Sequence, residues 1–318
     1  MDIVLILLVA LAVEFTLGDP PNVVHPVAWI GKAISSLERL GFIGGKTYQF
    51  VYGAVATLGL TAVVITASLF IVSWLKDINY VLYVIVAGVL LKMTFSFVYL
   101  RKTALHIKHL IENDETLDKA RFELRALVSR NTSKLTRPYL VSATVESVSE
   151  SLCDSLVSPL FFFVVFSLFG PYGIAAAFGF RVVSTFDSMI GYHGKYEYLS
   201  KFPARLDDVL NYLPARISAL LVVVAAGITR MGARRTWSIA RVDHLKTESP
   251  NAGWPMAAAA AALRVQFEKI DHYRLGRADR PMTPEVVDDS LRLINSATWV
   301  WFIICFAAGG LLYALAKA

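Results

Sequence analysis

The chain has 318 residues, of which 56% are hydrophobic, and its formal net charge at pH 7 is +6. This apolar content exceeds that of ordinary soluble domains, and the apolar residues are concentrated in runs of membrane-spanning length. The sequence therefore predicts a polytopic helical membrane protein. Its two cysteines and six histidines show no spacing typical of a disulfide framework or a transition-metal site. The positive-inside bias explains the net charge without a nucleic-acid partner, although anionic substrates would also fit it.

Six apolar runs are candidate membrane helices. Full spans are expected at about 2–17, 51–74, 80–100 and 297–315. The run 156–180 is broken by Gly170 and Pro171, and the run 217–229, extended at most to 232, is short. Such interrupted segments resemble the discontinuous helices that build sites within the membrane. We therefore expect one all-α membrane-embedded domain over residues 1–318, with about four full spans plus two short or re-entrant helices.

The polar segments predict the orientation of the chain. Residues 101–137 contain nine Lys or Arg, and residues 234–295 contain ten more. By the positive-inside rule, the regions of about 101–155 and 234–296 are expected to be cytoplasmic, with the active site at the cytoplasmic face of the plasma membrane. Lys92 lies inside the third apolar run, where a charge is costly, so we expect it to face the interior of the bundle.

The segment 138–159 carries the sharpest chemical signal. Read as a helix, it places Glu146, Glu150 and Asp154 at i, i+4 and i+8, so that three carboxylates follow one face. Like charges at this spacing repel, and either a divalent cation or cationic side chains from elsewhere would offset the repulsion. A solvated acidic face is the alternative. The position beside an apolar run favours a functional role.

A second acidic pattern follows the broken apolar run. Ser184 and Asp187 share a helical face after Arg181, and Asp207, Asp208 and Asn211 come shortly afterwards. Asp208 and Asn211 share a face, which presents hard oxygen ligands suited to Mg²⁺, and the flanking Arg205 and Arg216 match phosphate. The alternative is a helix N-terminus whose acidic residues complement the macrodipole.

The turn-rich stretch 249–255, which includes Asn251, precedes an Ala-rich helix whose free N–H groups would suit a phosphate. No common phosphate-loop or catalytic-triad motif is present. Two classes remain open: an enzyme that uses Mg²⁺ and a phosphorylated substrate, and a transporter coupled to protons or cations. The enzyme is favoured, because the polar motifs lie mostly outside the apolar runs and no inverted repeat is evident.

Five motifs follow one another along the chain: 17–21 with 25–31, 145–159, 185–192, 205–208 with Asn211 and 214–216, and 249–255. Taken together, they resemble the cobalamin-biosynthesis family of adenosylcobinamide-phosphate synthases (the CbiB/CobD family). The resemblance covers nearly the whole chain, with departures at Asn131, where the family usually has Asp, and at Ser184, where it usually has Asn.

This resemblance implies an integral membrane ligase that uses ATP and Mg²⁺. It would join an amino-alcohol phosphate, such as aminopropanol phosphate, to a propionate carboxyl of adenosylcobyric acid and yield adenosylcobinamide phosphate. The next membrane enzyme of cobalamin assembly is a possible partner. A membrane relative of the family without established chemistry, of regulatory type, is the non-enzyme alternative.

Residue roles follow from amide synthesis as hypotheses. Asp187 would accept the proton of the attacking amine, with Glu150 and Asp208 as further catalytic carboxylates. Mg²⁺ would be held by carboxylates, and phosphate groups by arginines with nearby polar side chains. The predicted metal ligands are Glu146, Glu150, Asp154, Asp207 and Asp208; the predicted substrate ligands are Arg181, Arg205, Arg216, Asn211, Asn251 and Ser184.

Overall fold

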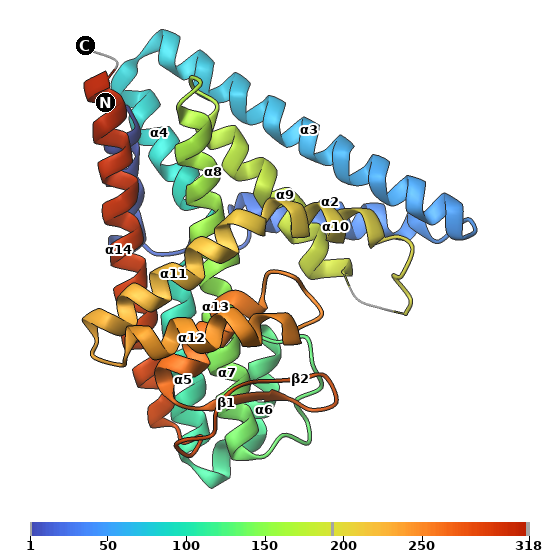
Figure 1. Cartoon of the computed structure of the whole chain (residues 1–318). Helices are drawn as coiled ribbons and strands as arrows, with labels where there is room; N and C mark the ends of the chain where they lie inside the picture. Colours follow the sequence, from blue (N-terminus) through green and yellow to red (C-terminus); the bar gives the residue numbers. More distant parts are fainter. Residues whose placement is uncertain (1, 192–193, 316–318) are drawn as a thin grey trace. The chain divides into compact units, whose positions relative to one another are not determined.

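The computed structural model describes residues 2–191 and 194–315 (Figure 1). Apart from one short hairpin, its regular elements are helices, which confirms the predicted all-α membrane fold. Two compact units make up the chain. The first comprises Met1–Ser96, Ser158–Asn211 and Ile304–Ala318, and the second comprises Phe97–Val157 and Tyr212–Ile303. The expectation of a single membrane-embedded domain stays a prediction.

The first unit is organised around α9, which packs against α2, α3, α4, α8 and α10, while α1 packs against α4. Close packing of α1 on α4 depends on Gly88, where an added Cβ would lie 2.5 Å from the side chain of Val9. This unit contains α1 (Asp2–Thr16), α2 (Pro26–Gly41), α3 (Lys46–Ile78), α4 (Tyr80–Lys92), α8 (Ser158–Ser167), α9 (Gly173–Ile190), α10 (Lys201–Leu210) and the end of α14 (Glu285–Leu315).

The second unit is built around the Ala-rich helix α13, which is buried along its length and contacts α7, α11, α12 and β2. Small side chains allow this close approach of neighbouring helices. The unit contains α5 (Val98–Glu112), η1 (Asp114–Thr116), α6 (Leu117–Glu123), η2 (Leu124–Ala126), α7 (Arg137–Leu152), the π-helical turn η3 (Cys153–Val157), α11 (Tyr212–Ile228), α12 (Ala233–Asp243), η4 (His244–Lys246), α13 (Gly253–Leu263), β1 (Gln266–Lys269) and β2 (Tyr273–Gly276).

The antiparallel hairpin of β1 and β2 is the one sheet among the described residues. Its register pairs Phe267 with Leu275, and both side chains are buried. These strands are not predicted by the sequence pattern, because they are only four residues long and lie in a polar region.

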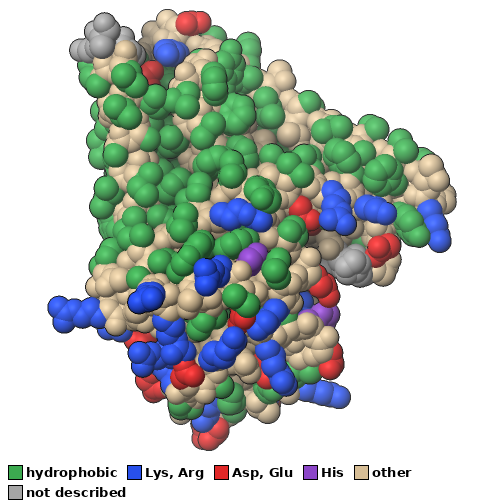
Figure 2. All heavy atoms as spheres, viewed as in Figure 1, with side chains coloured by type: hydrophobic (Ala, Val, Ile, Leu, Met, Phe, Trp, Pro, Cys, Tyr) green, Lys and Arg blue, Asp and Glu red, His purple; other side chains and the backbone are tan. Residues whose placement is uncertain are grey.

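Four helices are long and apolar enough to cross a membrane: Lys46–Ile78, Arg137–Ser167, Gly173–Ile190 and Glu285–Leu315. The expected spans 51–74 and 297–315 fall inside the first and last of these. The predicted interruption at Gly170 and Pro171 is confirmed, because α8 ends before it and α9 begins after it. Helices α10 and α11 pass the span criterion only as a bent pair. Figure 2 shows hydrophobic side chains over the visible surface of α3 and α14, and charged side chains over α12 and the hairpin.

The predicted full spans 2–17 and 80–100 require correction. Helix α1 has 15 residues and α4 has 13, which gives lengths of about 22 and 20 Å, short of a hydrocarbon core of about 30 Å. Helix α4 ends at Lys92, where the chain turns before α5 and the Thr94 hydroxyl donates to the Leu91 carbonyl. Lys92 itself is fully buried, as expected for a charge that faces the bundle interior.

Candidate functional site

Three carboxylates from two distant motifs meet in the first unit, and we name Asp187, Asp207 and Asp208 the acidic cluster. Asp187 lies near the end of α9 and the other two lie on α10, which packs against α9. Asp187 and Asp208 are close enough to interact electrostatically, and Asp207 interacts with both of them. The tertiary structure therefore unites residues that are separated by about twenty positions in the sequence.

Asn211 holds one member of the cluster in place. Its side chain is buried, and its Nδ2 donates to Asp207 Oδ2 at 2.9 Å. Its Oδ1 accepts a hydrogen bond from Ser158 Oγ at 2.6 Å. The sequence pattern predicts that Asn211 acts together with Asp208, whereas this hydrogen bond is made to Asp207, one α-helical turn away on the same side of the helix.

Asp207 and Asp208 do not lie at the start of α10, so they do not complement the macrodipole at its N-terminus, which was the alternative interpretation. Asp207 and Asp208 lie in the last turn of Lys201–Leu210, where the macrodipole disfavours negative charge. Asp207 Oδ1 is also buried and accepts no hydrogen bond from the described residues. A carboxylate in such a place costs free energy unless a cation or a donor compensates it.

The side-chain oxygens of the acidic cluster are of the type that binds Mg²⁺. Carboxylate and amide oxygens are hard ligands, and Mg²⁺ in substrate sites commonly takes one or two carboxylates together with phosphate oxygens and water. Among the described residues, no group of three or more Asp, Glu, His or Cys side chains has metal-binding geometry. Carboxylates of this kind would suit an ion that arrives with a phosphorylated substrate.

Cationic side chains approach the cluster from both helices. Arg181, on α9, interacts electrostatically with Asp207 and with His25. Arg205 Nη1 lies 3.8 Å from Asp208 Oδ2 and is largely exposed, so it is free to move toward a substrate. Ser184 is half-buried on α9, one turn before Asp187. The predicted substrate ligands of this unit thus surround the predicted carboxylates. Tyr192, the last residue of the 185–192 motif, lies outside the described residues.

His25 is the N-cap of α2 and belongs to the same electrostatic environment. Its Nδ1 accepts the Val27 N–H at 3.2 Å, which caps the helix and requires a ring nitrogen without a proton. Burial lowers the pKa of His25; the charge of Asp19 raises it, and those of Lys92 and Arg181 lower it further. His25 is therefore kept neutral by its surroundings.

A group of buried charges that the sequence analysis did not assign to the site lies beside His25. Lys92 Nζ is 2.6 Å from Glu14 Oε2 and also pairs with Asp19, whose other oxygen accepts from Ser96. Lys92 and Glu14 are 0% and 1% exposed. The sequence does contain a signal for this pair. Glu14 lies in the first apolar run and Lys92 in the third, and a charge inside an apolar bundle needs a partner.

In the second unit, Glu146 is at the centre of a buried hydrogen-bond network. It is 2% exposed, pairs with Arg130, and accepts hydrogen bonds from Ser142 Oγ at 2.6 Å and Tyr273 Oη at 3.0 Å. Burial raises the pKa of Tyr273, and the charges of Glu146 and Glu150 raise it further. The Arg130 side chain therefore offsets the charge of Glu146, the first carboxylate of the 146–154 pattern. A cationic side chain was one of the two expected means, and a divalent cation was the other.

Glu150 and Asp154 are half-buried, and the helix changes character between them. Helix α7 ends at Leu152, and the π-helical turn Cys153–Val157 contains Asp154. A π turn holds more residues than an α turn, so Asp154 departs from the i, i+4, i+8 face that a uniform α-helix would give. Such turns are frequent at functional sites. The metal-binding roles of Glu146, Glu150 and Asp154 stay predictions.

Two predicted substrate ligands from separate motifs of the second unit contact each other. Arg216 Nη1 donates to Asn251 Oδ1 at 3.0 Å, and its guanidinium lies 3.6 Å from the ring centre of Tyr212. Asn251 is buried just before α13 begins at Gly253. Trp254, a member of the 249–255 motif for which no role was predicted, stacks on His244 with ring centres 3.7 Å apart and lies beside the same guanidinium. An arginine held this way keeps further N–H groups for a ligand.

Comparisons with known proteins agree with the motifs. The model of the CobD/Cbib protein family matches residues 7–313. The cobalamin biosynthesis protein CobD of Dehalococcoides mccartyi (strain CBDB1) is 53% identical over 304 residues, which cover 96% of each chain. Probable cobalamin biosynthesis proteins CobD of Methanothrix thermoacetophila and Methanothermobacter thermautotrophicus are 38% and 36% identical, with 92% and 98% of this chain covered and 92% and 99% of theirs. No solved structure matches. The chain, in which the five motifs occur in order, therefore belongs to the CobD/Cbib family of cobalamin biosynthesis.

Proposed function

We propose that this protein is an ATP-dependent carbon–nitrogen ligase. It joins the amine of an amino-alcohol phosphate, such as aminopropanol phosphate, to a propionate carboxyl of adenosylcobyric acid and yields adenosylcobinamide phosphate. The observation that carries the proposal is the acidic cluster. Among the described residues, Asp207 Oδ1 is buried and finds no hydrogen-bond donor, and it lies beside Asp187 and Asp208 with Arg181 in electrostatic range. Carboxylates that face a cationic group at the end of a helix suit a phosphorylated substrate that carries a divalent cation.

The chemistry explains why such a site is needed. A carboxylate does not condense with an amine in water, so its oxygen first attacks the γ-phosphorus of ATP, and ADP leaves. The amine then attacks the carbonyl carbon of the acyl phosphate, the amide bond forms, inorganic phosphate leaves, and the amine nitrogen loses a proton. Both steps place negative charge on phosphate oxygens, and cationic groups in a site shielded from water stabilise it best.

The residues of the first unit divide this work. Asp207 and Asp208 would hold Mg²⁺, which when bound with ATP neutralises charge on the phosphate oxygens. Arg181 and Arg205 would bind phosphate through charge-assisted hydrogen bonds. Asp187 would accept the proton that the amine loses. Positioning a bulky corrinoid against two phosphorylated partners is mainly a task of orientation, which buried helices perform well.

The second unit holds a separate candidate phosphate ligand. Arg216, fixed by Asn251 and by the ring of Tyr212, presents a planar guanidinium of the kind that binds phosphate in a bidentate manner. Glu150 is the second candidate for a catalytic carboxylate. The basic polar regions favour a position of the site at the cytoplasmic face of the plasma membrane. The next membrane enzyme of cobalamin assembly is a candidate partner that would receive the product without its release.

A direct assay tests the proposal. Membranes that contain the protein are incubated with adenosylcobyric acid, aminopropanol phosphate and Mg·ATP, and the corrinoid is followed by mass spectrometry. We expect an ATP-dependent mass gain equal to the amine phosphate minus water. Asp208→Asn should lose this activity, whereas Asp118→Asn, at a 95% exposed side chain, should keep it.

One observation favours a different class of function. The fully buried Lys92, with its two carboxylate partners, resembles the intramembrane charges of ion-coupled transporters. A folded protein that gave no mass change with either aminopropanol phosphate or ethanolamine phosphate would contradict the ligase. It would favour transport or a regulatory membrane relative. The fluorescence of a pH-sensitive dye enclosed in proteoliposomes would separate these two, because only a proton-coupled transporter changes the internal pH.

A further inference from the structure

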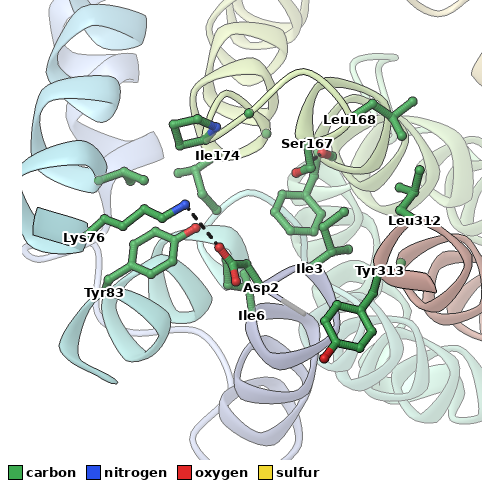
Figure 3. Close-up of a pocket in the computed structure, with 16 residues that line it drawn as sticks. Asp2, Ile3, Ile6, Lys76, Tyr83, Ser167, Leu168, Ile174, Leu312 and Tyr313 are labelled. Carbon is green, nitrogen blue, oxygen red and sulfur yellow. Dashed lines mark hydrogen bonds and ion pairs between the residues drawn. The ribbon is translucent and has the colours of Figure 1, made fainter. Parts of the chain in front are cut away.

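A cavity of about 290 Å³ opens in the first unit, at the end of the bundle where α1 begins and α14 ends (Figure 3). Its volume is near the lower limit for ligand pockets, roughly 300–1,000 Å³. Most of its wall is apolar, and the polar side chains at one side come from α1, α3 and α4. The apolar wall includes Ile3, Ile6, Val72, Leu168, Ile174 and Leu312.

The polar side of the cavity already holds an ammonium group. Lys76 Nζ lies 3.3 Å from Asp2 Oδ2 and 5.5 Å from the ring centre of Tyr83. Tyr80 Oη donates to Asp2 Oδ1 at 2.9 Å. An aromatic face attracts an ammonium ion, and a carboxylate beside it pairs with the charge. Lys76 and Asp2 are 41% and 34% exposed, so a ligand can reach the pair and replace one partner.

The cavity lies at the end of two candidate membrane spans, among residue types that are common at membrane boundaries. Lys76 is in the last turn of the candidate span α3, and the neighbouring Trp74 is 55% exposed. Trp and Tyr concentrate at such boundaries. Tyr313, near the end of the candidate span α14, lines the same cavity.

This cavity is separate from the acidic cluster. Gly173, at the start of α9, lines the cavity, and Asp187 lies fourteen residues further along the same helix. At 1.5 Å per residue the two positions are about 21 Å apart. A ligand of the cavity therefore does not share the groups that the proposed ligation uses.

We propose that this cavity binds a phospholipid whose headgroup carries a primary ammonium and a phosphate, as phosphatidylethanolamine does. The lipid ammonium takes the place of Lys76 beside Asp2 and Tyr83, Lys76 turns to the lipid phosphate, and one acyl chain lies on the apolar wall. A zwitterionic headgroup matches the Asp2–Lys76 pair charge for charge. An anionic headgroup without an amine pairs with Lys76 and leaves the Asp2 carboxylate unmatched.

Lipid binding to the full-length protein tests this assignment. The protein in detergent is titrated separately with phosphatidylethanolamine and phosphatidylglycerol of the same acyl chains, and bound lipid is counted by native mass spectrometry. We expect the first to bind about tenfold more tightly, the effect of one charge-assisted contact. Asp2→Asn should abolish this preference, and Lys76→Met should weaken both lipids. Asp77→Asn, an exposed acid on the same helix that does not line the cavity, should behave as wild type.

Further variants distinguish binding of the acyl chain from recognition of the headgroup, and both of these from a folding defect. Leu312→Trp narrows the apolar part without a change of charge and should weaken both lipids alike. Asp2→Glu keeps the carboxylate and should keep the preference. Equal binding of the two lipids to the wild type, or binding of soluble glycerophosphoethanolamine as tight as that of the lipid, would overturn the proposal. So would an Asp2→Asn protein that melts as wild type does and keeps the preference.

Discussion

Lys92 Nζ lies 2.6 Å from Glu14 Oε2, and the two side chains are 0% and 1% exposed, so α4 and α1 are joined by an ion pair shielded from solvent. Asp19, in the loop after α1, is the second partner of the same ammonium. The pair lies beside His25, which caps α2. The start of the chain is thus fixed to the bundle by charge as well as by apolar contact.

Removal of Lys92 should be severely destabilising. Lys92→Met leaves Glu14 and Asp19 buried without a cation, and breaking a buried pair from one side costs about 3–5 kcal/mol. We expect a large fall in melting temperature in detergent, measured by intrinsic fluorescence. Glu14→Gln in the Lys92→Met background should recover part of the loss. A Lys92→Met protein with the melting temperature of wild type would show that the pair adds nothing to stability.

Asp207 should contribute to activity at the expense of stability. Its buried Oδ1, which accepts no hydrogen bond within the described part of the chain, lies at the end of α10, where the helix dipole disfavours a negative charge. Asp207→Asn should therefore melt at the same or a higher temperature than wild type without ligands, lose the stabilisation that Mg·ATP gives, and turn over at least about 100-fold more slowly. Wild-type stabilisation by Mg·ATP in this variant would remove Asp207 from the proposed site.

The network around Glu146 should depend mainly on Arg130. Arg130→Met leaves the 2% exposed carboxylate with only neutral donors, and we expect a loss of about 3–5 kcal/mol in the free energy of unfolding. Tyr273→Phe removes one neutral donor and should cost about 1 kcal/mol. Denaturant unfolding in mild detergent compares the two. An equal effect of the two variants would mean that the ion pair is no stronger than the hydrogen bond.

Position 253, the first of α13, should accept no residue larger than glycine without a loss of stability. A Cβ at Gly253 would lie 2.2 Å from the His244 carbonyl oxygen, a backbone atom that cannot move aside cheaply. Gly253→Ala should therefore lower the melting temperature strongly and displace Trp254 and Asn251. Gly59→Ala is the matched control, because open space surrounds that position on α3. It should be neutral or stabilise by about 0.5–1 kcal/mol, as Ala does in helices.

Stability should fall in mild acid because of His25. Its pKa in the folded protein is lowered below 6.5 by burial, so the unfolded chain takes up the proton first as the pH falls. The contribution of the neutral ring is therefore fully present above about pH 6.5 and is lost below it. His25→Asn keeps a good capping side chain and does not titrate. The difference between the melting temperatures at pH 7.5 and pH 5.5 should be smaller in this variant than in wild type. An equal difference in the two proteins would contradict the assignment to His25.

The membrane class, the broken run at Gly170 and Pro171, and the residues of both acidic patterns could be predicted from the sequence, because local hydropathy, turn chemistry and helical spacing are properties of short segments. The motif order gave the family for the same reason: it is linear. The buried position of Lys92 also followed, since an ammonium in an apolar run has no favourable alternative.

Other features depended on contacts between distant segments. The end of α4 at Lys92 is set by partners on α1 and in the following loop, so hydropathy alone extended that span too far. The meeting of Asp187 with Asp207 and Asp208 depends on the packing of α10 against α9, and the neutralisation of Glu146 depends on Arg130. Residue types and spacing specify which charges need a partner, but which partner each one finds is decided by tertiary packing, because electrostatic and hydrogen-bond contacts act across space and leave no trace in local periodicity.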